Sequence, residues 1–191
     1  IGLENGTLDL YEQAEPGSDS LVLVERNFSG IQVYEHAAPA FADLDGDGLI
    51  ELLVGEFENV FYYEQDAPDS YSFSLVNSSL FSIAAGFLVP VISDLDNDDL
   101  LEVLLATDYA EVRCYEQSAQ GSTDFNLITN SIGVSIEWAS SFCVEDFDGD
   151  NKIDILSGRG GEISHYEQVA PGVILFEQID YNWLTIDDYF Y

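Results

Sequence analysis

Short apolar runs separated by polar residues recur along the chain, and no segment shows a sustained helical stripe. Residues 39–42, 51–57 and 60–64 are brief aliphatic and aromatic runs, with a polar turn at 58–59. Residues 71–76 alternate apolar and polar side chains, which is the pattern of a half-buried strand. Brief apolar runs bounded by turns are typical of strands buried in a sheet. The chain is therefore predicted to be all-β.

Two sequence markers recur with one shared period. Tyr-Glu-Gln begins at Tyr11, Tyr63, Tyr115 and Tyr166, which are 52, 52 and 51 residues apart. An Asp-rich segment begins at Asp43, Asp94 and Asp146, which are 51 and 52 residues apart. About four strands in roughly 50 residues is the size of one β-propeller blade. We interpret Tyr-Glu-Gln as a strand end that places Tyr in the core and Glu and Gln at the rim of the sheet.

The period predicts β-propeller-type repeats, about four blades in all, with three complete and one split or incomplete. The predicted segments are a partial N-terminal blade at 1–38, blades with the first and second Asp-rich loops at 39–89 and 90–140, and a blade with the third loop plus a C-terminal strand at 141–191. The partial blade starts after its loop, because Ile1-Gly2 aligns with Val54-Gly55. Three completions stay open: closure by residues 181–191, a longer polypeptide, or blades shared between neighbouring copies. We favour the last two.

Each Asp-rich loop places carboxylates at its positions 1, 3, 5 and 9. Ca²⁺ takes roughly six to eight oxygen ligands, and alternate residues of a tightly curled loop direct their oxygens to one point. The backbone carbonyl at position 7 is the natural further ligand. The expected ligands, for about three Ca²⁺ ions, are Asp43, Asp45, Asp47, Leu49 and Glu51; Asp94, Asp96, Asp98, Leu100 and Glu102; and Asp146, Asp148, Asp150, Lys152 and Asp154.

The turn residues agree with a metal loop, and other metal sites are disfavoured. Positions 4 and 6 hold only Gly, Asn or Asp, which best tolerate left-handed backbone angles. An EF-hand needs a Glu at position 12 and flanking helices, whereas position 12 here is Val54, Leu105 or Ser157 and the flanks are strands. Zinc is disfavoured because the loops contain neither His nor Cys.

The first loop with its flanking strands, residues 41–55 and 60–64, resembles an FG-GAP/VCBS repeat, the blade of integrin α-subunit heads and of many secreted microbial proteins. The resemblance covers essentially the whole chain. It implies Ca²⁺ in the hairpin loop between the first two strands of a blade, bound by the ligands named above. Two departures are Glu in place of Asp at position 9 of loops one and two, and Asp99 in place of Gly at position 6 of loop two.

Charge and termini bear on partners and location. Four Lys and Arg residues face 37 Asp and Glu, a formal net charge of −33, so nucleic acid and anionic membrane surfaces are disfavoured as partners. No apolar run approaches the roughly 20 residues that span a bilayer, so no membrane insertion is expected. The absence of Met favours a processed or excised piece of a secreted protein. Sequons at Asn5, Asn27 and Asn77 fit an extracellular glycoprotein. Cys114 and Cys143 either form one bridge or remain buried thiols.

No catalytic constellation is visible, so the chain is expected not to be an enzyme. His36 and His165, the two histidines, are expected at the surface or rim rather than as general bases. A structural or self-assembling extracellular scaffold, forming a homo-oligomer or filament, is the favoured function. The alternative is a module for adhesion to other extracellular proteins or for carbohydrate recognition, with Trp138 and Trp183 as the candidate sugar-stacking residues. Fold alone does not separate these two classes.

Overall fold

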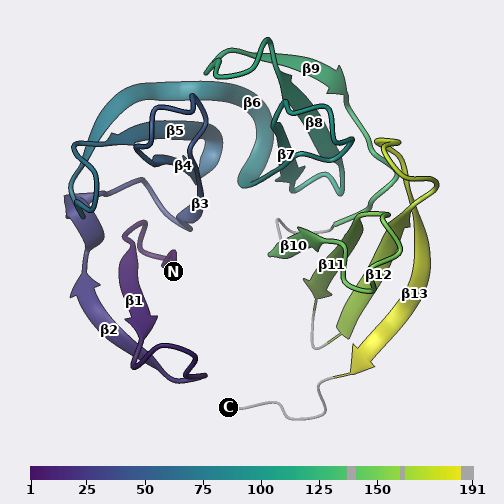
Figure 1. Ribbon diagram of the computed structural model, residues 1–191, viewed down its shortest axis with the longest axis horizontal. Coiled ribbons are helices and arrows are strands. Elements are labelled where there is room, and N and C mark those ends of the chain that lie inside the picture. Colours follow the sequence, from purple (N-terminus) through teal and green to yellow (C-terminus); the bar gives the residue numbers. More distant parts are fainter. Residues whose placement is uncertain (137–140, 160–161, 186–191) are drawn as a thin grey trace. The chain divides into compact units, whose positions relative to one another are not determined.

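The computed structural model describes residues 1–136, 141–159 and 162–185. Within them the chain forms thirteen strands and one short 3-10 turn, so the all-β prediction is confirmed (Figure 1). The chain divides into two compact units, Ile1–Pro90 and Val91–Tyr191. The long strand β6, Phe73–Ser93, runs across the boundary between them.

The first unit contains a two-stranded and a larger antiparallel sheet. Its elements are β1 (Asp9–Gln13), β2 (Leu21–Arg26), the 3-10 turn η1 (Phe28–Gly30), β3 (Ala38–Ala42), β4 (Glu51–Gly55), β5 (Phe57–Gln65) and most of β6. Strand β1 pairs with β2, and β3, β4, β5 and β6 are neighbours in chain order. Such a meander arises because each connection is a short turn between antiparallel strands.

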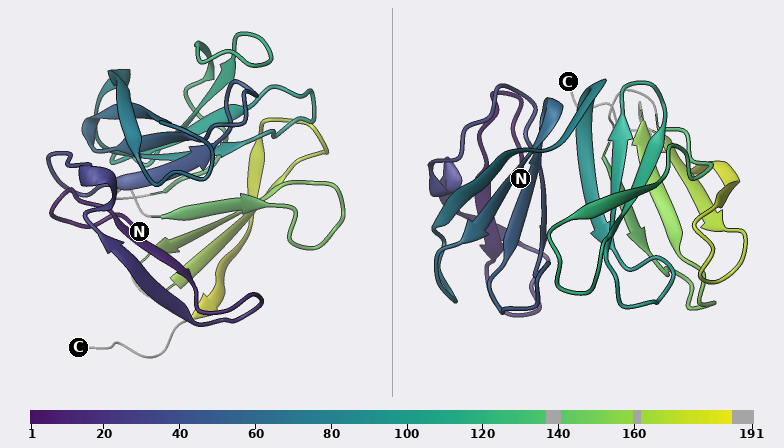
Figure 2. Two further views of the ribbon diagram at one scale, coloured as in Figure 1. Left: turned by 60° about the vertical axis from the view of Figure 1, so that its left-hand side comes forward. Right: turned by 90° about the horizontal axis from the view of Figure 1, so that it is seen from above.

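The second unit continues the same pattern. Its strands are the end of β6, then β7 (Glu102–Thr107), β8 (Val112–Gln117), β9 (Phe125–Thr129), β10 (Phe142–Glu145), β11 (Asp154–Arg159), β12 (Glu162–Gln168) and β13 (Phe176–Thr185). The neighbours are β6-β7-β8-β9 in one set and β10-β11-β12-β13 in the other. Figure 2 shows these strands from two further sides.

The strand after each Asp-rich loop is the most buried of its sheet. Every residue of β4 and of β7 is buried. Their Leu-Leu-Val and Val-Leu-Leu runs carry apolar side chains on both faces, which is the composition of a strand covered on both sides. Because β4 and β7 begin with the acid at loop position 9, the core strand carries that acid inward.

The partial N-terminal repeat follows the geometry of the complete one. A Cβ on Gly2 would lie 1.6 Å from the Ala37 carbonyl oxygen, and a Cβ on Gly55 would lie 2.0 Å from the Leu88 carbonyl oxygen. In both places the backbone shortly before the next Asp-rich loop passes where only Gly fits. The alignment of Ile1-Gly2 with Val54-Gly55 is therefore confirmed. The register also shifts directly before each Tyr-Glu-Gln tyrosine.

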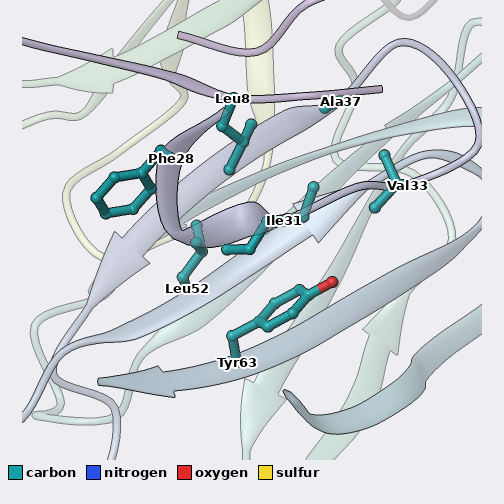
Figure 3. Close-up of a cluster of buried hydrophobic side chains, with 8 residues drawn as sticks. Leu8, Phe28, Ile31, Val33, Ala37, Leu52 and Tyr63 are labelled. Carbon is teal, nitrogen blue, oxygen red and sulfur yellow. The ribbon is translucent and has the colours of Figure 1, made fainter. Parts of the chain in front are cut away.

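The core of the first unit joins the N-terminal segment to the first complete repeat (Figure 3). Leu8 precedes β1, whereas Leu52 lies on β4 and Tyr63 on β5. The full cluster is Leu8, Phe28, Ile31, Val33, Ala37, Leu52, Val54 and Tyr63. Since apolar burial contributes roughly 25 cal/mol per Å², this cluster is a principal reason for the two segments to pack together.

The structure leaves the predicted propeller open and corrects the prediction for the two cysteines. The sheets in the described residues are open, so the propeller, the blade count and the four predicted segments stay predictions. Both alternatives for the cysteines are wrong, because Cys114 is a buried thiol and Cys143 an exposed one, with no bridge. Burial raises the pKa of the Cys114 thiol to about 12.

Candidate metal sites

Each Asp-rich loop connects two antiparallel neighbours: β3 to β4, β6 to β7, and β10 to β11. Positions 4 and 6 have positive φ in all three loops: 76° and 87° at Gly46 and Gly48, 61° and 69° at Asn97 and Asp99, and 79° and 68° at Gly149 and Asn151. Asp99, the departure from the usual Gly, therefore adopts the same left-handed turn as its equivalents. Loop two is built like the other two.

The carboxylate at position 1 holds this turn together. Asp43 accepts hydrogen bonds from the backbone N–H of Gly46 at 2.8 Å and of Gly48 at 3.1 Å. Asp94 and Asp146 accept the equivalent pairs of bonds at 2.7–3.2 Å. The position 5 carboxylates accept the N–H of position 7 in each loop. These bonds curl the loop and direct its carboxylates inward.

The acids at positions 1, 3 and 9 converge in every loop. The three groups each offer ligand oxygens within 4.8 Å of one another: Asp43, Asp45 and Glu51; Asp94, Asp96 and Glu102; and Asp146, Asp148 and Asp154. Three of the five predicted ligands of each loop thus meet at one place. Such an arrangement of hard oxygen donors is what Ca²⁺ or a similar cation prefers.

The position 9 glutamates are buried beneath the loops. Glu51 and Glu102 are both 0% exposed, and each accepts a hydrogen bond from the backbone N–H of position 2, Leu44 or Leu95. Burial, with the nearby Asp charges adding to it, raises the pKa of Glu51 to about 7 and that of Glu102 to about 8. A buried carboxylate without a compensating cation is costly, so these residues favour a bound positive charge.

The second oxygen of each buried glutamate has no protein partner. Among the described residues, Oε1 of Glu51 and Oε1 of Glu102 are buried without a hydrogen bond, as is Oδ1 of Asp96. Buried polar atoms are nearly always paired, and an orphaned one calls for a ligand or ion. The residues of loops one and two therefore fit a divalent cation.

Loop three satisfies its position 9 acid differently. Asp154 is 2% exposed, and its Oδ2 accepts the Phe147 N–H at 2.9 Å. Its Oδ1 lies 2.7 Å from Nε2 of His165, on the neighbouring strand β12. His165, expected at the rim, is in fact partly buried against this loop.

In loops two and three, the position 5 acid belongs to a second group that includes the Glu of Tyr-Glu-Gln. Asp96, Asp98 and Glu116 meet beside loop two, and Asp148, Asp150 and Glu167 beside loop three, each within 4.8 Å. In loop three the ammonium of Lys152 contacts both Glu167 and Asp150, the latter at 3.2 Å. Lys152 therefore brings a positive charge that loops one and two lack at position 7.

The Gln of Tyr-Glu-Gln has a structural role that the rim interpretation missed. Gln117 and Gln168 are 2% and 1% exposed, so placing this Gln at the rim is wrong. In all three repeats the side-chain Oε1 of this Gln accepts a hydrogen bond from the backbone N–H of loop position 8 at 2.9–3.1 Å. The backbone N–H of the same Gln donates to the carbonyl of position 8 at 3.0 Å. The recurrence of Gln after every Tyr-Glu is the sequence feature that pointed to this role. Tyr63 and Tyr166 are buried as predicted, whereas Tyr11 is exposed, so the core placement is wrong for the first tripeptide.

The remaining candidates lie away from the loops. The predicted glycosylation residues Asn5, Asn27 and Asn77 are all exposed, and their occupancy stays a prediction. His36 is exposed and packs edge to face on Phe87 at 4.7 Å. Trp138 lies outside the described residues, as does the side chain of Trp183.

Comparison with known families agrees with this geometry. A family model described as FG-GAP-like repeat matches residues 43–105 and 94–157, which together span more than half of the chain. No curated protein matches the chain. No helix in the described residues combines the length and apolar character that crossing a membrane requires. Two overlapping matches that each begin at an Asp-rich loop show that this chain belongs to the FG-GAP-like repeat family.

Proposed function

We propose that this chain is an extracellular calcium-binding repeat module with a structural, non-enzymatic role. FG-GAP-like repeats are typical of extracellular proteins. The observation that carries calcium binding is the pair of buried, unpartnered oxygens, Oε1 of Glu51 and Oε1 of Glu102, each beside two Asp carboxylates. Ca²⁺ would link the loop to the core strand that begins with this glutamate, so binding and folding are coupled.

Loop positions 1, 3 and 9 would hold the ion, with the position 5 acid and the position 7 carbonyl completing the shell as predicted. The chemistry supplied by Ca²⁺ is charge neutralisation and oxygen coordination. The other residues of each loop hold the turn: Gly, Asn or Asp at positions 4 and 6 adopt positive φ. Direct titration with Ca²⁺ by calorimetry tests the proposal, and the absence of binding would refute it.

A self-assembling scaffold is the preferred form of this role. Strands β2, β6 and β9 carry exposed apolar side chains, including Leu21 and Val22 on β2, Leu75 and Val76 on β6, and Leu127 and Ile128 on β9. The net charge of −33 keeps copies apart at low ionic strength. Divalent cations lower that repulsion, so self-association is expected to increase with calcium. Light scattering in chelator and in millimolar calcium measures this, and equal scattering would argue against assembly.

Recognition of a carbohydrate is the second candidate, and one surface feature favours it. An open hollow of about 530 Å³ is lined by Leu3, Glu4, Asn5, Tyr34 and Glu35. Tyr34 is 78% exposed beside acidic and amide groups, an arrangement suited to stacking on a sugar ring with polar contacts around it. A glycan array with the wild-type chain and with Tyr34→Ala tests this, and binding that is absent or unaffected by the substitution would exclude this hollow.

A further inference from the structure

The Tyr-Glu-Gln strands do not all have the same neighbours. Strands β5, β8 and β12 each lie between two others, one of which follows an Asp-rich loop. Strand β1 carries the same tripeptide but, in the part of the chain that the structure describes, pairs along its length only with β2 (Figure 1). From Leu10 to Gln13, none of the described strands pairs with its other edge, and unpaired backbone groups favour pairing with another strand.

The strand that would cover this edge is defined by the repeat. Gly2 bridges Leu8 as Gly55 pairs with Val60 in the complete repeat. The backbones of Ile1 and Asp9 exchange two hydrogen bonds of 2.9 Å. Residues 1 and 2 therefore occupy, beside β1, the place that the end of β4 occupies beside β5. The edge from Leu10 to Gln13 corresponds to the part of β5 that the rest of β4 covers.

Gln13 is the β1 equivalent of the glutamines that bind the Asp-rich loops. Its equivalents Gln65, Gln117 and Gln168 bind both backbone groups of loop position 8, at 2.9–3.1 Å. In the described residues the Gln13 side chain is exposed and makes no hydrogen bond. Tyr11 is 37% exposed, whereas Tyr63 and Tyr166 are 8% and 5% exposed. This edge therefore has the residues of a covered strand, but no strand within the described ranges covers it.

We propose that the open edge of β1 binds, antiparallel, the strand of an Asp-loop hairpin from a further FG-GAP-like repeat, with its position 8 residue clamped by Gln13. A second copy of this chain is not the expected source. In each copy, β4, β7 and β11 already have a neighbour on both sides. The inference depends on the repeat register and not on calcium binding, so the two can fail separately.

The probe is a synthetic peptide of residues 38–53, this chain's own first hairpin, added to the 191-residue chain. It ends before Val54, because Ile1 already occupies the equivalent place. We expect hydrogen exchange to slow at the amides of Tyr11 and Gln13, and calorimetry to show binding. The substitution Gln13→Ala in the chain should weaken binding about fivefold, since it removes one hydrogen bond. A peptide carrying Ile50→Pro lacks the position 8 N–H and should bind at least about tenfold more weakly.

Four results would overturn the proposal. They are no protection of Tyr11 and Gln13 by the peptide, equal affinity of the Gln13→Ala chain, equal affinity of the Ile50→Pro peptide, and protection of this edge by dimerisation without peptide. As a second measurement, residues 38–53 are fused directly before Ile1, with a scrambled fusion as control. We expect only the native order to raise the melting temperature and to slow exchange at Tyr11 and Gln13. Equal behaviour of the two fusions would also reject the proposal.

Discussion

Loops one and three share the Asp pattern but differ in how they balance their charge. In loop one, Glu51 is buried with an unpartnered oxygen and a raised pKa of about 7. In loop three, both oxygens of Asp154 have protein partners, and Lys152 contacts Asp150 and Glu167. Loop two resembles loop one. Under the proposed calcium-binding role, loops one and two leave their charge to an external cation, whereas loop three carries the ammonium of Lys152.

The largest expected effect is that of removing calcium. At a 100-fold excess over Kd, each bound ion stabilises the fold by about 2.7 kcal/mol, so chelation should lower the melting temperature markedly. The loss should be uneven: hydrogen exchange should accelerate at Leu44 and Leu95, whose N–H groups bond the buried glutamates, more than at Phe147. Equal acceleration at all three amides would remove the distinction between the loops, and unchanged melting would refute metal binding.

Neutralising one buried glutamate should separate its two roles. Gln at position 51 still accepts the Leu44 N–H but carries no charge. Glu51→Gln should therefore raise the melting temperature in chelator, because no buried charge remains, and lower the calcium stoichiometry by one ion. Calorimetry and thermal melts measure the two effects. Glu15→Gln, at an exposed position, is the control and should change neither; a variant of Glu51 with full stoichiometry would exclude it as a ligand.

Acidification should weaken calcium binding mainly at loops one and two. The folded pKa values of Glu51 and Glu102, about 7 and about 8, exceed the usual carboxyl value of 4.5. The calcium-free fold thus holds protons that the unfolded chain releases, so its stability should rise as pH falls from about 8 toward 4.5. Calcium must displace those protons, so its affinity should fall over the same window. Titrations at pH 8 and 6 measure this; uptake without proton release would contradict it.

The smallest expected effect concerns Lys152. Its ammonium contacts Asp150 and Glu167. The predicted ligand of this residue is its backbone carbonyl, which a side-chain substitution leaves in place. Lys152→Met should increase the calcium affinity of loop three about severalfold at low salt, because the ammonium no longer competes with the ion for Asp150 and Glu167. The increase should shrink as salt screens it. Arg26→Met removes one charge away from the loops and is the control. An equal increase in that control would assign the effect to net charge alone.

Much of the fold was predictable because the repeat is local. Strands at 39–42 and 60–64 were expected from brief apolar runs. The first lies within β3 and the second within β5. The turn that was expected at 58–59 lies inside β5, which already starts at Phe57. Glu58 makes this turn with a φ of 61°. The length of β6 was not predicted. It joins the last strand of one repeat to the first strand of the next, and no periodicity marks such a junction.

The sequence by itself determined the turn of the Asp-rich loops and the acids that converge in it. Both follow from local chemistry: Gly, Asn and Asp permit positive φ at positions 4 and 6, and a curled nine-residue loop brings positions 1, 3 and 9 together. Only the tertiary structure decided what surrounds each loop. His165, Glu116, Glu167 and the clamping Gln reach the loops from a neighbouring strand. Their approach depends on sheet register, which is not visible in the spacing of one motif.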